Sequence, residues 1–385
     1  MLIEPGQYLQ PRPMSLTEQR QVLRAALQPG ANARDEAMAW LPRANIESMG
    51  FDSLRLMPQL YERLRTEGID SPLLPRLKGL KKHAWSRNNL LFHRASDAIS
   101  VLQREEIDVM LIKGTALIIA YYRDYSLRPM NDADLLVPYR HALRACQALA
   151  RSGLRNEFLI PENPHSIGQS FQYRHAAHFI DSSGRDLDLH WNLLAYRFGP
   201  CADEDFWAAS VETVLGGHKV RILNPADQLL HVCVHGIDLP PIRWIPDALA
   251  VLRRTPDLDW DRLLALARKN TLTLMISRTL EHIERDFSAD VPPEVLADLR
   301  RTHVSFFDRY ECWQRSSPDN LLFAWPRRTL YLFLCRSRGN TLRVRLHLFL
   351  DLLCFELRVA GKSQIPAAFC RKTVSRMIRY FRTRS

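Results

Sequence analysis

The spacing of apolar residues in the first hundred residues is that of amphipathic helices. Apolar positions recur three and four residues apart over residues 16–27, over 54–64, and through a longer run from about 83 to 105. Proline and glycine punctuate the intervals between these segments. The pattern predicts a helical N-terminal region that covers residues 1–105.

A different pattern begins at Ile107, where short apolar runs alternate with helical segments. The run IDVMLI (107–112) predicts a strand that stops at a glycine turn, and TALIIAYYRDY after it has the length of a helix. DADLLVP (132–138) predicts a second strand, and the helix that follows is closed by Gly153. Two strand–helix units in succession indicate an α/β core, which we assign to residues 106–200.

A hairpin is predicted beyond the second helix. RHAAHFID (174–181) and RDLDLHW (185–191) flank a short loop that contains glycine. In the second arm Asp186, Asp188 and His190 share one face of the strand, whereas the leucines and the tryptophan share the other. The pattern is that of a half-buried strand that presents acids away from a core.

Helical spacing resumes from about residue 203, with prolines as boundaries, and predicts a helical C-terminal domain over 201–385. Charged residues interrupt the apolar segment LHLFLDLLCFELRVAG (346–361), so we interpret it as a buried helix and expect no membrane span. The tail at 367–385 carries six Arg or Lys and no acid. Contact between this tail and a polyanion is a hypothesis beside that of a solvated helix.

The composition indicates which kind of partner the protein binds and in which cellular compartment we expect it. The 385 residues are 46% hydrophobic, enough for one large core or two smaller ones, and the net charge of +11 favours an anionic partner. The seven cysteines are odd in number, widely spread and without a C-x-x-C pair, which argues against a disulfide framework and a zinc knuckle. The N-terminus lacks the basic stretch followed by an apolar run that is typical of a signal peptide, so we expect a cytoplasmic protein.

The predicted second strand carries a pair of acids suited to divalent cations. Asp132 and Asp134 are two residues apart, so their carboxylates point to the same side of the strand. Transfer chemistry at the phosphates of a nucleoside triphosphate uses Mg²⁺, and a third carboxylate commonly completes a two-metal site. Asp188 is the candidate for the third ligand, and Asp186 on the same face is its rival.

The first strand ends in a turn suited to phosphate. Backbone N–H groups at the start of a helix bind phosphate, and Gly114 allows close approach to the backbone. Thr115 has a hydroxyl that can cap the helix or bond a phosphate oxygen, and Lys113 adds positive charge. Arg128, in the loop before the acids, is a further candidate for contact with the triphosphate.

Histidines near these motifs have competing interpretations. His190 is suited either to contact substrate or steady a carboxylate, or to bond the backbone at a strand end. His231 and His235 are four residues apart on a predicted helix, but no glutamate follows His231 as a metalloprotease motif requires. For this pair we favour packing or a hydrogen bond to Asp247.

The segment LIKGTALIIAYYRDYSLRPMNDADLLV resembles the DNA polymerase β-like nucleotidyltransferase superfamily. More narrowly, KGTAL, YY, RPMNDADLLV and LDLHW in this order resemble the bacterial family of uncharacterised nucleotidyltransferases, over about residues 107–195. One departure is the Gly-Thr turn, where many superfamily members have Gly-Ser and a shorter interval to the acids. The longer interval resembles toxin-like relatives that also have a lysine before the glycine.

The resemblance implies an α/β fold with a mixed sheet flanked by helices, two Mg²⁺ ions, and an NTP such as ATP as donor. It implies that Asp132, Asp134 and Asp188 are the metal ligands. It does not imply an acceptor, so a small molecule, a sugar, a peptide and RNA all stay open. The alternatives to an enzyme with this activity are a nucleotide-binding regulatory or scaffold protein with a degenerate site, and a toxin-like transferase that acts on RNA.

Overall fold

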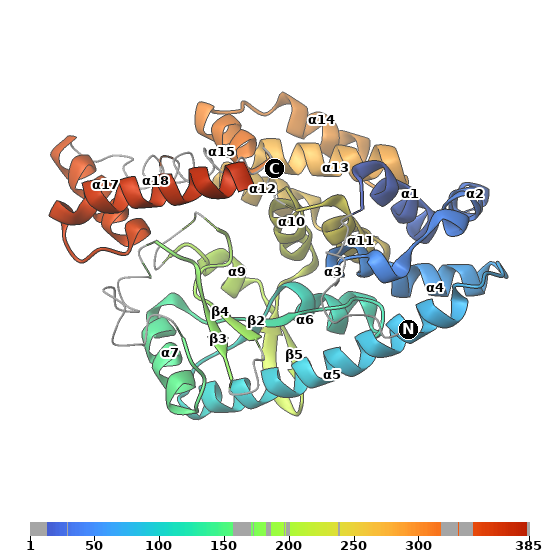
Figure 1. The fold of residues 1–385 in the computed structure, drawn as a ribbon, viewed down its shortest axis with the longest axis horizontal. Helices are drawn as coiled ribbons and strands as arrows, with labels where there is room; N and C mark the ends of the chain where they lie inside the picture. Colours follow the sequence, from blue (N-terminus) through green and yellow to red (C-terminus); the bar gives the residue numbers. More distant parts are fainter. Residues whose placement is uncertain are drawn as a thin grey trace. The chain divides into compact units, whose positions relative to one another are not determined.

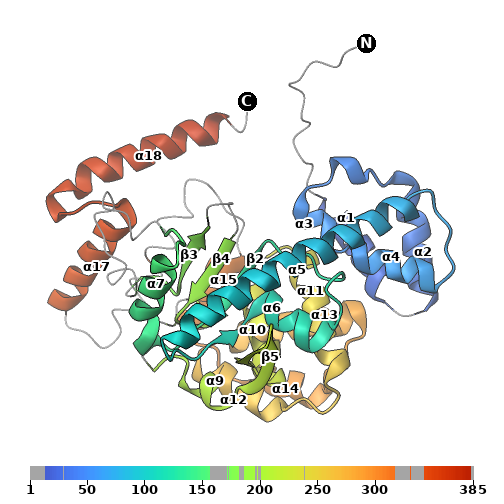
Figure 2. The same ribbon diagram turned by 90° about the horizontal axis from the view of Figure 1, so that it is seen from below.

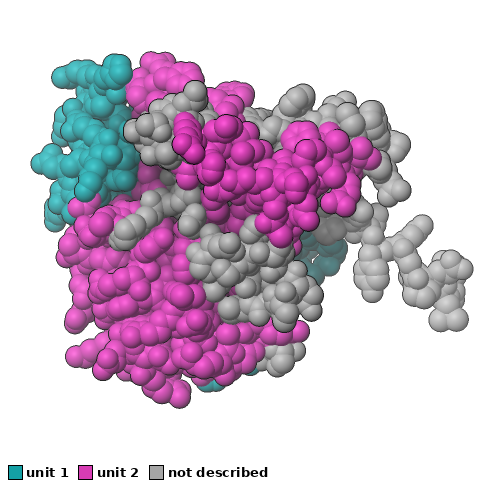
Figure 3. Space-filling view, turned by 90° about the vertical axis from the view of Figure 1, so that its left-hand side faces the viewer, with its two compact units in different colours: residues 1–94, 112–133, 223–303 teal, residues 95–111, 134–222, 304–385 magenta. Residues whose placement is uncertain are grey.

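The computed structural model describes residues 14–382, apart from 29, 157–170, 172, 182–185, 196, 198–200, 238, 317–329 and 331–341. The chain divides into two compact units, each assembled from three separate segments (Figure 3). Unit 1 comprises residues 1–94, 112–133 and 223–303, and unit 2 comprises 95–111, 134–222 and 304–385. The sequence predicted three contiguous regions, and that division stays a prediction.

One mixed six-stranded sheet organises unit 2. Its strand order is β3-β4-β2-β1-β6-β5. Strand β1 pairs antiparallel with β2 and parallel with β6, so the predicted mixed sheet is confirmed. The strands are β1 (Met110–Leu111), β2 (Asp132–Leu136), β3 (Ala176–Ile180), β4 (Asp186–His190), β5 (Val211–Leu215) and β6 (His218–Ile222); the first two residues of β2 are counted with unit 1.

The alternation of side chains along β3 and β4 fixes their pairing. Leu187, Leu189 and Trp191 are buried, as are Ala177 and Phe179 on the opposing arm. The arms pair antiparallel, and a slip of one residue would turn all of these apolar side chains to the other face. The predicted hairpin is therefore confirmed, and helix α7 (Ala142–Arg151) lies beside it (Figures 1 and 2).

The hairpin formed by β5 and β6 corrects the expectation of continuous helix beyond residue 203. Gly216 and Gly217 connect the two strands with φ angles of 57° and 84°, which favour glycine and a tight turn. Residues 211–222 carry polar groups throughout, so the period-two signal there is weak. The partner that stabilises β6 is β1, about 110 residues earlier in the chain.

The described residues of unit 1 form helices, their connections and the start of β2. Helix α1 packs on α2, α4 and α11, and α10 packs on α11, α12 and α13. The helices of unit 1 are α1 (Leu16–Leu27), α2 (Ala31–Trp40), α3 (Phe51–Leu54), α4 (Met57–Thr66), α6 (Lys113–Leu117) with a π-helical continuation (Ile118–Tyr122), α10 (Pro225–Gly236), α11 (Pro241–Arg254), α12 (Trp260–Lys269), α13 (Thr273–Phe287) and α14 (Pro293–Arg301). Helix α5 (Leu74–Arg104) begins in unit 1 and ends in unit 2. The predicted helical N-terminal region is confirmed from Leu16 onward.

Among its described residues, unit 2 also contains the helices α9 (Glu204–Ala208), α15 (Phe306–Ser316), α17 (Leu342–Leu357) and α18 (Ile365–Arg382). The segment expected to be a buried helix is helical, but its burial is one-sided: Leu352 and Phe355 are buried whereas Leu346 is 57% exposed. No helix among the described residues is long and apolar enough to cross a membrane. The basic tail lies largely on α18, and its contact with a polyanion stays a prediction.

The glycine turn between β5 and β6 yields a test of the fold. A Cβ atom on Gly216 would lie 2.3 Å from the Ser96 hydroxyl, whereas a Cβ on Gly217 meets nothing within 4 Å. We expect Gly216→Ala to lower the free energy of unfolding by about 2–4 kcal/mol, because a clash adds to the left-handed backbone cost. Gly217→Ala is the matched control, with about 1–2 kcal/mol lost through backbone conformation alone. Equal thermal midpoints for the two variants would contradict the packing against Ser96.

Candidate active site

Three potential metal ligands converge on one face of the sheet in unit 2. Strands β2 and β4 are neighbours, and they place Asp134, Asp188 and His190 so that one ligand atom of each lies within 4.8 Å of the other two. Asp134 and His190 are buried, and Asp188 is partly exposed. A group of two carboxylates and an imidazole has the donor chemistry of a divalent cation site.

The imidazole of His190 is bonded to the carboxylate of Asp134. Nε2 of His190 lies 3.0 Å from Oδ1 of Asp134, and the two residues are 1% and 4% exposed. A buried carboxylate is costly without a hydrogen-bonding partner, so this contact both stabilises Asp134 and fixes its orientation. Of the roles considered for His190, that of steadying a carboxylate is the one this geometry supports.

A second histidine, which the sequence did not single out, contacts Asp188. Nδ1 of His178 lies 2.7 Å from Oδ1 of Asp188, and the two residues are directly opposite each other in the β3–β4 register. His178 is about half exposed, so this pair faces the open side of the sheet. Counting outward from the predicted hairpin loop is the signal that could have placed His178 beside Asp188.

Asp132, the other acid of the D-x-D pair, lies outside this cluster. Asp132 is two residues before Asp134 on β2 and partly buried, but it is not one of the three residues whose ligand atoms converge. The backbone of Asp186 pairs with Ile180 at the opposite end of β4 from His190. The side chain of Asp186 is outside the described part of the structure, so the choice between Asp186 and Asp188 stays a prediction, as does the role of Asp132.

The predicted phosphate turn lies in unit 1, directly after β1 and one intervening residue. Ile112 is the N-cap of α6, and Lys113 follows with a left-handed φ of 49°. Such a conformation in a residue other than glycine costs free energy and is concentrated at functional sites. The hydroxyl of Thr115 donates to the carbonyl of Ile112 at 2.7 Å, so it does not serve as the N-cap.

Gly114 provides space for a close contact within unit 1. A Cβ atom there would lie 2.4 Å from Nη1 of Arg128 and 2.4 Å from Sδ of Met130. The guanidinium of Arg128 is thus packed directly against the turn. From the sequence we expected glycine at position 114 to allow a phosphate to approach the backbone. The structure shows a second reason for glycine there, because the side chain of Arg128 packs against it.

Arg128 is held in place by a carboxylate from a distant helix. Asp247 on α11 accepts from Nε of Arg128 at 2.7 Å and from Nη2 at 2.8 Å. From the sequence we expected a histidine of α10 either to pack or to donate a hydrogen bond to Asp247. In the structure these distances identify Arg128 as a partner of Asp247. The rings of His231 and His235 stack on each other with centroids 6.1 Å apart.

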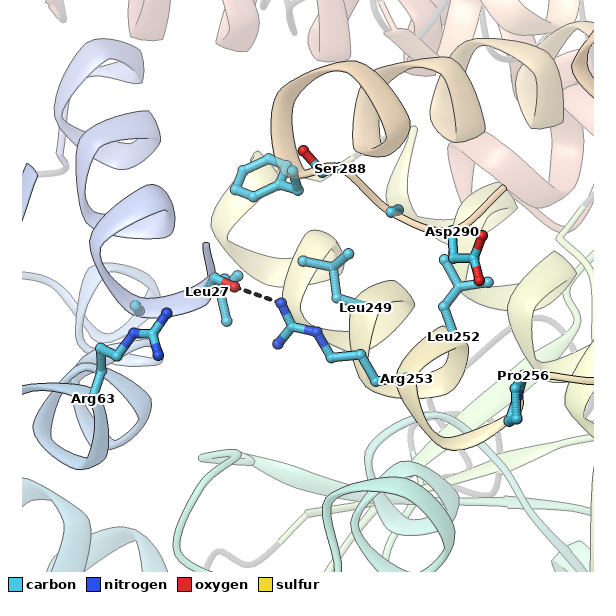
Figure 4. Close-up of a pocket in the computed structure, with 11 residues that line it drawn as sticks. Leu27, Arg63, Leu249, Leu252, Arg253, Pro256, Ser288 and Asp290 are labelled. Carbon is cyan, nitrogen blue, oxygen red and sulfur yellow. Dashed lines mark hydrogen bonds between the residues drawn. The ribbon is translucent and has the colours of Figure 1, made fainter. Parts of the chain in front are cut away.

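A cavity of about 460 Å³ in unit 1 lies apart from these motifs (Figure 4). Arg253 donates to the carbonyl of Leu27, and Arg63 donates to that of Gln28, so both arginines cap the last carbonyls of α1. The other walls are largely apolar: Leu249, Leu252, Pro256 and Phe287. The arrangement accounts for both arginines as anchors of α1.

A cavity of about 500 Å³ in unit 2 is lined by Trp191, Arg140, Arg221 and Asp203. Asp203 precedes α9 and accepts from the backbone N–H of Leu193 at 2.8 Å. Burial raises the pKa of this carboxyl to about 7, although the hydrogen bond from Leu193 acts in the opposite direction. Asp203 is therefore a buried acid that changes charge near neutral pH.

Comparison with known proteins gives one family and several structural likenesses. A family described as uncharacterised nucleotidyltransferase matches residues 52–288. The solution structure of the antibiotic-resistance factor ANT(2'')-Ia is 14% identical, with 51% of this chain and 98% of that chain covered and a TM-score of 0.34. An antigenic nucleotidyltransferase-like protein from Paracoccidioides brasiliensis is 13% identical, with 54% and 95% covered and a TM-score of 0.32. Among curated proteins there is no significant match.

The contact between Gly114 and Arg128 is testable by thermal unfolding. We expect Gly114→Ala to lower the free energy of unfolding by about 1–3 kcal/mol, because Arg128 is tied to Asp247 and must be displaced. Gly79 in α5 is the matched control, since a Cβ there meets nothing within 4 Å. Gly79→Ala should stabilise by about 0.5–1 kcal/mol through helix propensity. A neutral Gly114→Ala would contradict the packing described.

Asp203 gives the protein a pH-dependent stability. Its pKa is about 7 in the folded chain and ordinarily 3.8, so the folded state binds more protons between these values. The contribution of Asp203 to stability is therefore present below about pH 4 and lost as the pH rises to about 7. We expect Asp203→Asn, which keeps an acceptor for Leu193, to raise the thermal midpoint at pH 8 by about 2 °C or more and to flatten its decline above pH 5. An unchanged pH profile would count against the raised pKa.

Proposed function

Since the chain belongs to the family of uncharacterised nucleotidyltransferases, we propose that it transfers a nucleoside monophosphate from an NTP to an acceptor oxygen. An oxygen of the acceptor attacks the α-phosphorus, the bond between that phosphorus and the α–β bridging oxygen breaks, and pyrophosphate leaves. The observation that carries the proposal is the convergence of Asp134, Asp188 and His190 on adjacent strands.

Asp134 and Asp188 fit a divalent cation, and we propose that they hold Mg²⁺ together with Asp132. The fit rests on carboxylates that approach one another from two strands, one of them buried and oriented by His190. Two Mg²⁺ ions bound there would supply neutralisation of the charge that develops on the phosphates. His190 serves as a positioning residue that holds the carboxylate of Asp134.

Asp188 is proposed to have a second role as the base. Its carboxylate is partly exposed, and one oxygen already accepts a contact from His178. When the acceptor is a hydroxyl, its proton passes to a carboxylate oxygen of Asp188 as the oxygen attacks phosphorus. His178 would steady the carboxylate while it takes up this proton.

The turn after β1 is proposed to bind the triphosphate. Lys113 adds charge beside the first N–H groups of α6, Gly114 presents its backbone, and Thr115 completes the turn through its bond to Ile112. Arg128 reaches this turn with Nη1. The donor is proposed to be ATP or another NTP, and the acceptor is a hydroxyl or phosphate on a small molecule, sugar, peptide or RNA.

The experiment is a transfer assay with α-³²P-labelled ATP, GTP, CTP and UTP, Mg²⁺ and a fractionated cell extract as the source of acceptor. We expect labelled product from the wild-type protein and a loss of at least about a hundredfold for Asp134→Asn and for Asp188→Asn, because each removes a charge from the proposed metal site. EDTA should abolish transfer. Asp132→Asn tests whether this acid belongs to the site.

Asp186→Asn is the matched control, since it removes one acid from the same strand and the same face. It should retain transfer within about threefold. Transfer that survives both Asp134→Asn and Asp188→Asn would contradict the proposed site. Binding of NTP without release of pyrophosphate in any extract fraction would favour a nucleotide-binding regulatory protein instead.

A further inference from the structure

We infer that Asp247 is a positioning residue for nucleotide binding, which holds Arg128 against the Lys113–Thr115 turn so that Nη1 is directed to a donor phosphate. The inference rests on the proposed function, since it assigns a residue to the same donor site. All of the contacts on which it depends lie within unit 1.

The pair between Asp247 and Arg128 holds the guanidinium through two of its nitrogens. Nε and Nη2 of Arg128 donate to the two carboxylate oxygens at 2.7 and 2.8 Å, and the side chains are 14% and 8% exposed. A fork of this kind fixes the plane of the guanidinium. The remaining nitrogen, Nη1, is the atom that lies against Gly114.

Asp247 is itself fixed by a third donor. The hydroxyl of Tyr122, in the π-helical turn that continues α6, donates to Oδ1 of Asp247 at 2.9 Å. Burial and then the charge of Asp247 raise the pKa of Tyr122 well above its ordinary value, so the hydroxyl keeps its proton and stays a donor. The carboxylate therefore links the helix that begins at the phosphate turn to the arginine that lies on it.

The backbone of the loop that carries Arg128 is held independently. The fully buried amide of Asn88 donates to the carbonyls of Tyr125 and Arg128 at 2.6 and 2.8 Å, and its oxygen accepts from the N–H of Met130 at 3.2 Å. Arg128 is thus restrained at both its backbone and its guanidinium. A cation fixed before binding loses little conformational entropy when a phosphate arrives.

Two further guanidinium groups, those of Arg55 and Arg243, lie in the same region of unit 1 as Arg128. Arg55 and Arg243 each lie within ion-pair distance of Asp52, at 3.4 and 3.6 Å. Burial, and then the charges of Arg128 and Arg243, lower the pKa of Arg55 to about 10. The positive charges of Arg128 and Arg243 therefore act on the same region of unit 1 as that of Arg55.

A buried Asp–Arg pair also occurs for structural reasons alone, and unit 1 contains a matched example. Asp227 on α10 accepts from Nε and Nη2 of Arg262 on α12, at 2.8 Å for both contacts. Asp227 is fully buried. This pair has the same fork geometry and joins two helices, but no atom of Arg262 is among the three nearest to a Cβ at Gly114, which belong to Arg128 and Met130. A variant of Asp227 therefore serves as a control that distinguishes loss of stability from loss of the positioning of Arg128.

The experiment measures binding of a ribose-labelled fluorescent ATP analogue in the presence of Mg²⁺ to the full chain. We expect Asp247→Asn to raise the Kd by about tenfold, because loss of the charged fork frees Arg128 from the turn, and Asp227→Asn to change it by less than about twofold. Tyr122→Phe, which keeps the fork, is a milder variant that should raise the Kd by about two- to threefold. Thermal midpoints of all variants are measured in parallel.

A double-mutant cycle with Arg128→Ala distinguishes action through Arg128 from general destabilisation. We expect the double variant Arg128→Ala, Asp247→Asn to bind no more weakly than Arg128→Ala alone. Additive effects, equal weakening by Asp247→Asn and Asp227→Asn, or unchanged binding in both Asp247→Asn and Tyr122→Phe would overturn the inference while leaving nucleotide binding intact. Absence of binding by the wild-type protein to the analogue and to all four NTPs in competition would overturn the proposed function, and this inference with it.

Discussion

The buried carboxylate of Asp134 is the main constraint on the sheet of unit 2, because a buried charge needs a hydrogen-bonding partner. A carboxylate on a central strand would destabilise the fold without a partner, because burial removes its water. His190 supplies that partner from the neighbouring strand, and the position of β4 in the sheet follows from the apolar face formed by Leu187 and Leu189. The same packing that buries the hydrophobic face therefore brings the polar face of β4 to Asp134.

The polar face of the sheet is graded in exposure. Asp134 and His190 are buried, Asp188 is a quarter exposed, and His178 is about half exposed. This gradient suits different tasks: a buried carboxylate is held rigidly, whereas a more exposed one can exchange protons with an incoming group. The proposed second role of Asp188, proton transfer in addition to metal binding, follows from that difference.

Unit 1 also contains a charged side chain that is largely buried, in this case the guanidinium of Arg128. Arg128 is nearly buried, and Asp247 balances its charge while leaving Nη1 against the glycine turn. The loop between the turn and the D-x-D strand is long, and Asn88 compensates for this length by bonding three of its backbone groups. A longer loop is thereby compatible with a fixed arginine.

The strands at 132–136, 176–180 and 186–190 follow from the sequence alone, as does the separation of apolar and acidic faces on β4, because each depends on periodicity over a few residues. The predicted turn at Lys113–Thr115 is instead the beginning of helix α6, which starts at Lys113. The β5–β6 hairpin escaped prediction because its stabilising partner is β1, far along the chain. That Asp247 holds Arg128 is evident only in the folded chain. Such contacts depend on how helices and strands pack, and no local spacing encodes a distance between residues 119 positions apart.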